Sequence, residues 1–213
     1  MDPSFDRYQQ TCRQLGLEVT CEQYGRLVRY AALVREWNRK INLVSRKDTE
    51  RILGYHVTDS LAVQSLVPAG ARVCDVGSGA GLPGIPLAIV RPDATVLLIE
   101  SIKKRSQFLR HATAELEIAN AEVFAARAES LPPLECDVIL SRLTGAMEDV
   151  LADCARHRRP SGVMVFYKNR ESERDLKRAA RSLTKLKLQP ARLHDVELPG
   201  TEITRRFVVI GSA

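Results

Sequence analysis

The sequence lacks the features of a membrane or secreted protein. Its longest apolar stretches, such as residues 96–99, have the length of a strand, whereas a membrane helix needs roughly 18 apolar residues in a row. Residues 1–6 contain no basic segment followed by an apolar one, so we expect no signal peptide. These absences lead us to expect a soluble, cytoplasmic protein with no membrane partner.

Cysteine and histidine are too scattered to form a zinc site or a disulfide framework. The five cysteines include no CxxC pair, and the four histidines show no HxH or HxxxH spacing. We therefore expect reduced, mostly buried thiols and no bound metal. The sequence also lacks internal repeats and low-complexity linkers.

Charge is the first positive signal. The 213 residues carry a formal net charge of +6 at pH 7, with a pI of about 9.2. That excess favours a polyanionic partner, but it fits a basic enzyme of another kind equally well. Hydrophobic residues make up 45% of the chain, which suits one full domain with a buried core and a small appendage.

The pattern of apolar residues changes at about one third of the chain. The first part is typical of helices, with apolar side chains at helical spacing over residues 24–34 and 52–61. Asp48 is expected to be the N-cap of the second of these helices. We predict an N-terminal helical extension over residues 1–62, followed by a larger domain over residues 63–213.

Within this larger domain, short β-branched runs alternate with segments of helical length. The alternation predicts an α/β fold in which a mostly parallel sheet has helices on both faces. The last two runs are joined by a Pro-Gly turn, which predicts an antiparallel pair at the end of the sheet. The expected strands cover residues 72–76, 95–99, 121–124, 137–140, 163–166, 191–198 and 205–210.

The strongest motif is a glycine-rich loop after the first expected strand. Gly77, Gly79 and Gly81 alternate, and glycine is favoured where φ is positive or where the backbone approaches a ligand. In an open α/β sheet, such a loop at the carboxyl end of the first strand marks a site for a nucleotide-like ligand. Residues 79–84 match the dinucleotide pattern GxGxxG, but out of register, because Gly77 already ends the strand. Pro83 predicts that the next helix begins late.

Two acids accompany this loop. Asp75 precedes Gly77 by two residues, where its carboxylate can hold the loop and face a cationic ligand. Glu100 ends the second expected strand, where a carboxylate can accept hydrogen bonds from the two hydroxyls of a ribose. Every nucleoside cofactor offers that ribose, so Glu100 leaves NAD and S-adenosylmethionine open. The basic residues 103–105 then open a helix against its dipole, which indicates either a phosphate partner or a solvated face.

The segment from Asp75 to Ala88 resembles the first motif of the glucose-inhibited division protein B family, the bacterial 16S rRNA guanine-N7 methyltransferases. Its Leu-Pro-Gly-Ile-Pro stretch at residues 82–86 is highly specific, and the resemblance covers nearly the whole chain. This sequence departs from the family at Tyr55, where an Arg is usual and one RNA contact is thereby in question. It also has Glu100 for the common Asp and Leu143 for the usual Ala.

The resemblance implies a class I S-adenosylmethionine-dependent methyltransferase with seven strands, the last of them antiparallel. It implies transfer of a methyl group from S-adenosyl-L-methionine to N7 of a specific guanine in 16S rRNA. The small ribosomal subunit is then the partner, and we expect the protein to be a monomer. The residues that the resemblance assigns to the cofactor are Asp75, Gly77, Gly79, Leu82, Glu100, Ala128, Glu129 and Arg142.

Arg142 is the expected catalytic residue, although it should act by positioning rather than by proton transfer. N7 of guanine carries no proton, so the reaction needs no general base, and catalysis must come from geometry and electrostatics. Arg142 could orient the base or hold the methionine carboxylate, and the sequence leaves both roles open. His56 is expected to be packed or hydrogen-bonded rather than catalytic.

Phosphate contacts are expected to supply the affinity for RNA. The cations expected at or beside strand ends are Lys104, Arg105, Arg127, Lys168, Arg205 and Arg206, with Arg156, Arg158 and Arg159 as further candidates.

Two other functions stay open at this point. An NAD-dependent dehydrogenase could use Glu100 and the GxGxxG match, but only residues 1–62 remain to form its second domain. A non-catalytic RNA-binding protein with a vestigial fold is the other alternative, and the intact Asp75, Glu100 and Arg142 argue against it.

Overall fold

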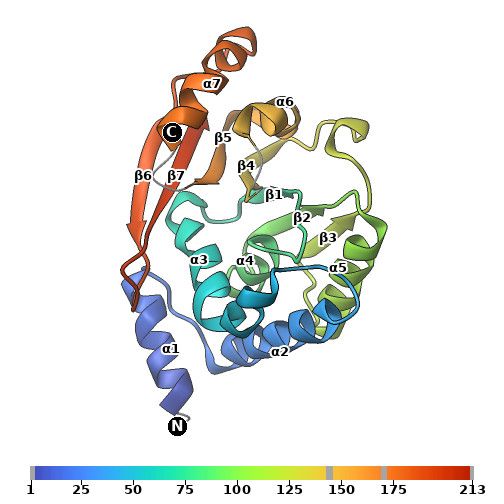
Figure 1. Ribbon diagram of the computed structural model, residues 1–213, viewed down its shortest axis with the longest axis vertical. Coiled ribbons are helices and arrows are strands. Elements are labelled where there is room, and N and C mark those ends of the chain that lie inside the picture. Colours follow the sequence, from blue (N-terminus) through green and yellow to red (C-terminus); the bar gives the residue numbers. More distant parts are fainter. Residues whose placement is uncertain (1–2, 143–145, 169–171, 212–213) are drawn as a thin grey trace.

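The computed structural model describes residues 3–142, 146–168 and 172–211, so Leu143 lies outside the described residues. A seven-stranded sheet with the strand order β3-β2-β1-β4-β5-β7-β6 crosses the molecule (Figure 1). Strands β1 to β5 are parallel, and β7 runs antiparallel to both β5 and β6. The expected α/β class and the antiparallel end of the sheet are thereby confirmed. The strands are β1 (Arg72–Val76), β2 (Thr95–Ile99), β3 (Ala121–Phe124), β4 (Cys136–Ser141), β5 (Arg158–Lys168), β6 (Arg192–Glu197) and β7 (Thr204–Gly211).

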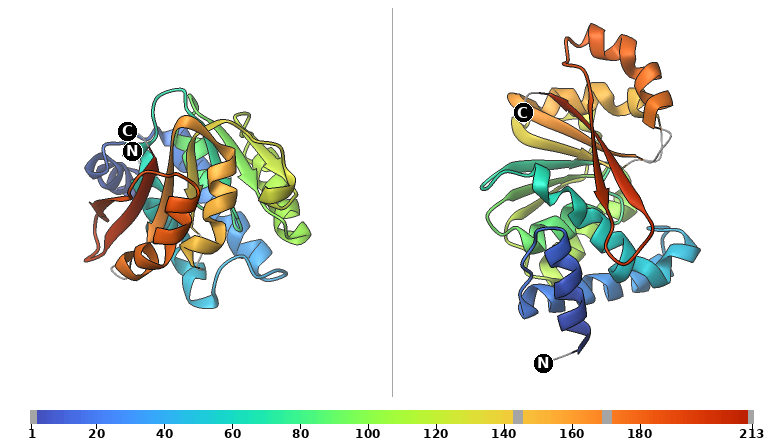
Figure 2. Two further views of the ribbon diagram at one scale, coloured as in Figure 1. Left: turned by 90° about the horizontal axis from the view of Figure 1, so that it is seen from above. Right: turned by 90° about the vertical axis from the view of Figure 1, so that its left-hand side faces the viewer.

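Helices cover both faces of this sheet (Figure 2). Side chains of the central strands alternate between two hydrophobic clusters, one on each face. On β1, Val73 joins one hydrophobic cluster and Cys74 joins the other. Because central parallel strands are buried on both faces, they appear in the sequence as continuous apolar runs, which explains why β1 and β2 were predicted correctly. The first face carries α1 (Pro3–Gln14), α2 (Cys21–Asn38), α3 (Thr58–Leu61), α4 (Gly84–Val90) and α5 (Lys103–Glu115), and the second carries α6 (Met147–His157) and α7 (Ser172–Lys185).

The helical segment between α2 and β1 begins earlier than the sequence indicated. It starts at Arg46 with Ser45 in the N-cap position, so the expectation that Asp48 is the N-cap was wrong. The Asp48 carboxylate instead accepts a hydrogen bond from Ser45 Oγ, at 2.6 Å, and faces His56. The segment comprises 3-10 helix η1 (Arg46–Arg51), π-helix η2 (Ile52–Val57), α3 and 3-10 helix η3 (Ala62–Leu66), and η4 (Ala128–Ser130) follows β3.

The N-terminal helices share a core with the sheet. Leu27, Tyr30 and Val57 are fully buried in the same cluster as Val73 and Val138. The β6–β7 hairpin extends from the sheet toward α1, as both sets of views show (Figures 1 and 2). The boundary expected between residues 62 and 63 falls inside η3, after its first residue, and separate folding of the two parts stays a prediction. Over the described ranges, no helix has both the length and the apolar character to cross a membrane.

Candidate active site

The glycine loop follows β1 at the edge where the parallel strands end. Gly77, Gly79 and Gly81 have φ angles of +74°, +57° and +87°, a region that favours glycine, so the predicted reason for these glycines is confirmed. A Cβ atom added to Gly79 would meet only the Gly77 carbonyl oxygen, at 3.8 Å, so the space above this residue is open. A Cβ on Gly84 would collide with Leu98 and Asp75, because α4 starts directly against the sheet. The loop is therefore tightly packed against the sheet at Gly84 and has free space on its outer side at Gly79.

Asp75 lies beneath this loop and is fully buried. Its Oδ2 accepts a hydrogen bond from the Gly84 amide at 3.0 Å, whereas its Oδ1 is buried without a partner among the described residues. Burial raises the pKa of Asp75 to about 7, against the opposing effects of the Gly84 amide and the Arg142 charge. A buried oxygen without a donor suits a ligand that brings a cationic N–H group.

Glu100 connects the loop to the start of α5. One carboxylate oxygen accepts from the Gly79 amide at 2.9 Å, and the other accepts from the Ile102 amide at 2.7 Å. The side chain is almost completely buried, at 4% exposure. Each oxygen keeps a second lone pair, so a ribose contact would add to these bonds rather than replace them. The ribose role of Glu100 stays a prediction.

A cleft beside the loop brings several of the expected cofactor residues together. Gly77, Ala128 and Glu129 all line it, although they come from different strand ends. Leu82, by contrast, is 8% exposed and belongs to the hydrophobic core beneath the loop. The full lining comprises Val76, Gly77, Ile99, Ser101, Ala126, Arg127, Ala128, Glu129, Val150 and Asp153.

Val150 and Asp153 were not identified from the sequence. Both lie on α6, and Asp153 is placed so that burial and the charge of Glu129 raise its pKa. Helical spacing could have indicated which face of α6 is buried. It could not have shown that this face meets the loop after β3, because that contact depends on the packing of α6.

Arg142 follows β4 and is held by the N-terminal helical segment. Its Nη1 donates to Ser60 Oγ at 3.2 Å, and its Nη2 lies 2.6 Å from His56 Nδ1. The same Nη2 lies 3.3 Å from Oδ2 of the fully buried Asp59. Asp59 also accepts from Arg205 Nε, at 2.5 Å, so one buried carboxylate binds two arginines.

The contact with Arg142 fixes the protonation of His56. A guanidinium can only donate, so His56 Nδ1 must accept and the proton resides on Nε2, which lies 3.2 Å from Asp48 Oδ1. Burial lowers the pKa of His56, and the charge of Arg142 lowers it further, so the ring is neutral at pH 7. This arrangement agrees with a hydrogen-bonded rather than a catalytic histidine.

Comparison with known proteins places this site in a family. The family model GidB, described as rRNA small subunit methyltransferase G, matches residues 23–204. The chain belongs to the GidB family. A relative from Bordetella avium, named Ribosomal RNA small subunit methyltransferase G, is 39% identical over 170 residues, which cover 77% of this chain and 76% of the relative. A relative of the same name from Methylobacillus flagellatus is 36% identical over 200 residues, 93% of each chain.

Solved structures of S-adenosylmethionine-dependent enzymes share the fold of this GidB-family chain. The M. jannaschii TYW2 structure in complex with AdoMet superposes with a TM-score of 0.59 at 16% identity, covering 81% of this chain and 77% of that one. Aeropyrum pernix fibrillarin with natively bound S-adenosyl-L-methionine gives 0.54 at 14% identity, covering 67% and 66%. At these identities the likeness shows the fold alone, a class I methyltransferase fold.

Tyr55, one of the three positions at which the sequence was expected to depart from the family, has a cation close by. The guanidinium of Arg51 lies over the Tyr55 ring, 4.4 Å from its centroid. The Tyr55 ring also meets the His56 ring edge-on, with centroids 5.0 Å apart. Arg51 therefore keeps a positive charge next to the histidine that contacts Arg142.

The expected phosphate contacts fall into two groups. Arg205 and Lys168 are mostly buried and engaged internally, since Arg205 binds Asp59 and donates to the Lys168 carbonyl, while Lys168 Nζ lies 2.7 Å from Asp175. Lys104 is exposed and Arg105 is half-buried in the first turn of α5, and Arg127 is exposed at the rim of the cleft. Arg206, also expected at a strand end, pairs with Asp195. Of the further candidates, Arg159 pairs with Asp137, and Arg156 and Arg158 donate to backbone carbonyls.

Proposed function

We propose that this chain transfers a methyl group from S-adenosyl-L-methionine to N7 of a specific guanine in the 16S rRNA of the bacterial small ribosomal subunit. The observation that carries the proposal is the GidB match over residues 23–204. It is joined by relatives named Ribosomal RNA small subunit methyltransferase G, whose similarity to this chain extends over most of their length. The cleft supports it, because a buried acid without a donor lies below an open glycine loop.

The residues around the cleft fit a nucleoside that carries a cationic amino acid. Oδ1 of Asp75 would accept from the ammonium group, which also satisfies the buried oxygen. Glu100 would take the ribose, Gly77 would line the methionine and ribose portion, and Ala128 and Glu129 would border the adenine. S-adenosyl-L-methionine, when bound, supplies the methyl group as an electrophilic sulfonium.

Arg142 would position the guanine at the mouth of this cleft. Because N7 carries no proton, neither His56 nor Asp75 has to accept one from the base. A methylated guanine gains positive charge, which a bare cation beside it would oppose. The buried Asp59 offsets part of the Arg142 charge, so Arg142 can offer hydrogen-bond donors at a lower electrostatic cost.

The test is methyl transfer to small ribosomal subunits from a strain without this modification. Purified protein and methyl-labelled S-adenosylmethionine should label 16S rRNA, and chemical cleavage at N7-methylguanine should map one position. Subunits that already carry the modification should not be labelled. Calorimetric titration with S-adenosylmethionine and with NAD separates this proposal from a dehydrogenase, and RNA binding without any transfer would favour a non-catalytic protein.

The site of action and the assembly state belong to the same proposal. The small subunit is a cytoplasmic particle, so we place the activity in the cytoplasm. All cofactor residues named above come from one chain, so we propose that a monomer suffices. Light scattering during turnover, with activity proportional to protein concentration, checks this.

A further inference from the structure

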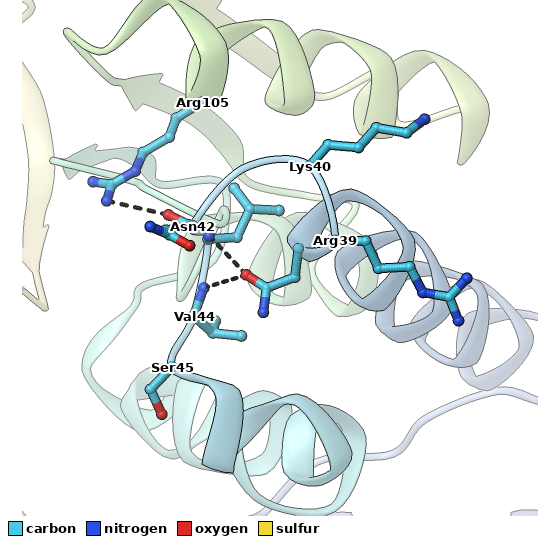
Figure 3. A pocket seen from close by; sticks show the side chains of 8 residues that line it. Arg39, Lys40, Asn42, Val44, Ser45 and Arg105 are labelled. Atoms are coloured by element: carbon cyan, nitrogen blue, oxygen red, sulfur yellow. Dashed lines mark hydrogen bonds between the residues drawn. The ribbon is translucent and has the colours of Figure 1, made fainter.

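We propose that a basic groove between the 39–45 loop and the first turn of α5 holds the sugar–phosphate backbone of the RNA substrate. This inference rests on the proposed function and concerns a surface outside the cofactor cleft. Figure 3 shows the groove, with Arg105 reaching from α5 toward Asn42 while Arg39 and Lys40 extend from the end of α2. We call it the loop groove, and its lining comprises Asn38, Arg39, Lys40, Asn42, Leu43, Val44, Ser45 and Arg105.

The loop groove is lined by cations that form no ion pair among the described residues, although Asp48 bonds to Ser45 at its edge and Glu50 lines a neighbouring pocket with Arg39. Arg39 and Lys40 are exposed, Arg105 is half-buried, and the lining contains no Asp or Glu. None of these three cations forms an ion pair with a carboxylate of the described residues. Arg205 and Lys168, by contrast, each pair with a carboxylate. Unpaired cations gathered on one surface attract a polyanion and gain affinity by releasing its counterions.

The backbone of the groove is held in place without any ligand. Asn38 Oδ1 accepts from the amides of Leu43 and Val44, at 2.8 and 3.0 Å. Arg105 Nη2 donates to the Asn42 carbonyl at 3.3 Å, which ties the loop to α5. Because these bonds fix the loop, a ligand does not have to pay for ordering it.

The groove continues toward the cofactor cleft. An adjoining depression shares Lys40, Asn42 and Arg105 with it and adds Ile41, Ile102 and Lys104. Ile102 is an apolar side chain at 48% exposure, and its amide donates to Glu100 of the candidate cofactor site. Cations spread along a surface beside an exposed apolar side chain fit successive nucleotides, in which phosphates and bases alternate, better than they fit a single ion.

The test compares two double variants that remove equal charge. Arg39→Gln with Lys40→Gln removes two cations from the groove, and Arg110→Gln with Arg181→Gln removes two exposed cations elsewhere on α5 and α7. For a single-stranded fragment of 16S rRNA, the groove variant should lower the slope of log K against log salt by about 1.4. If the two proteins bind equally at 1 M salt, a change of about 1.4 in the slope makes the groove variant bind about 25-fold more weakly at 0.1 M salt. The control variant should change affinity less than threefold, and both should bind S-adenosylmethionine as the wild type does.

The outcomes separate this inference from the proposed function. A groove variant that keeps the wild-type salt slope while the wild type still methylates the subunit overturns the groove and leaves the proposed function standing. A wild type that transfers no methyl group ends the proposed function, whereas a shallower slope for the groove variant alone still supports an RNA contact here. If inorganic phosphate at constant ionic strength displaces the RNA only when Arg39 and Lys40 are present, the RNA phosphates share the groove with it and the inference is supported. Phosphate that binds through these two residues without displacing the RNA would make the groove a free-phosphate site and overturn the inference.

Discussion

Nη2 of Arg142 lies 3.3 Å from Oδ2 of Asp59, a carboxylate that is fully buried. Asp59 also binds Arg205, so a single acid on α3 joins the residue after β4 to the start of β7. The position of the candidate catalytic arginine therefore depends on the N-terminal helical segment as well as on the sheet.

Asp59→Asn should destabilise the protein by about 3–5 kcal/mol, because two buried guanidinium groups lose their compensating charge. Urea unfolding measures this loss. Glu18→Gln is the matched control, since Glu18 pairs with Arg13 at the surface and is 72% exposed. It should cost less than about 1 kcal/mol. Equal losses in the two variants would mean that Asp59 does not stabilise the arginines.

His56→Ala should lower the rate of methyl transfer by about 10- to 100-fold, because Arg142 loses the acceptor that orients it. The affinity for S-adenosylmethionine should stay within about twofold of the wild type. His56→Asn offers an oxygen close to the position of Nδ1 and should restore part of the rate. A general base would not be rescued in this way, so equal rates for the Ala and Asn variants would contradict the positioning role.

The affinity for S-adenosylmethionine should fall as the pH drops below 7. In the free protein the pKa of Asp75 is about 7, and a bound ammonium group would lower it, so the cofactor prefers the ionised form that dominates above pH 7. Calorimetry should show a loss approaching about tenfold per pH unit below that point. Asp75→Asn should bind weakly at every pH, without this slope.

The stability of the cofactor-free protein should depend on Asp75 in the opposite sense. A folded-state pKa raised above the unfolded value contributes stability at low pH, and this contribution is lost as the pH rises through 7. At pH 8, Asp75→Asn should therefore be more stable than the wild type by about 1–3 kcal/mol. This is less than the full raised pKa would give, because the Asn side chain also changes the hydrogen bonding at this position. An Asn variant less stable than the wild type at pH 8 would show that the ionised, buried carboxylate does not destabilise the folded protein.

Arg205→Ala should act on stability rather than on RNA binding. Its side chain is 15% exposed and its guanidinium binds Asp59, so removing it should cost about 3 kcal/mol and leave the salt slope unchanged. Lys104→Gln removes an exposed cation without an ion pair among the described residues and should lower the slope by about 0.7. Filter binding at several salt concentrations distinguishes the two. A lower slope for Arg205→Ala would place this arginine on the RNA after all.

The sequence predicted a strand well where the apolar pattern of that strand alone reflects its burial. The central strands are buried on both faces and were predicted almost to the residue, whereas the exposed polar start of β5, at residues 158–161, did not resemble a strand. That start is a strand because Arg158 pairs with Cys136 on β4. Such a pairing is a tertiary contact, which local apolar patterning does not contain.

The same distinction applies to the site. Asp75, Gly77 and Glu100 could be identified because strand ends of an α/β sheet meet at one edge. The ion pairs of Asp59 could not, because they join segments far apart in the chain through the conformation of α3. The cations at residues 39 and 40 were missed for a related reason. Their significance comes from a groove lining without Asp or Glu, and only the folded loop reveals which residues form that lining.

The place of Arg205 on β7 has a consequence for how the protein is made. Asp59 is synthesised 146 residues before Arg205, and the two meet only after β7 has inserted between β5 and β6. Until then the nascent chain holds an acid on α3 that lacks one of its two arginines, and Arg142 lacks its finished support. The support of Arg142 is therefore completed only once β7 has joined the sheet, well after Asp59 and Arg142 have themselves been synthesised.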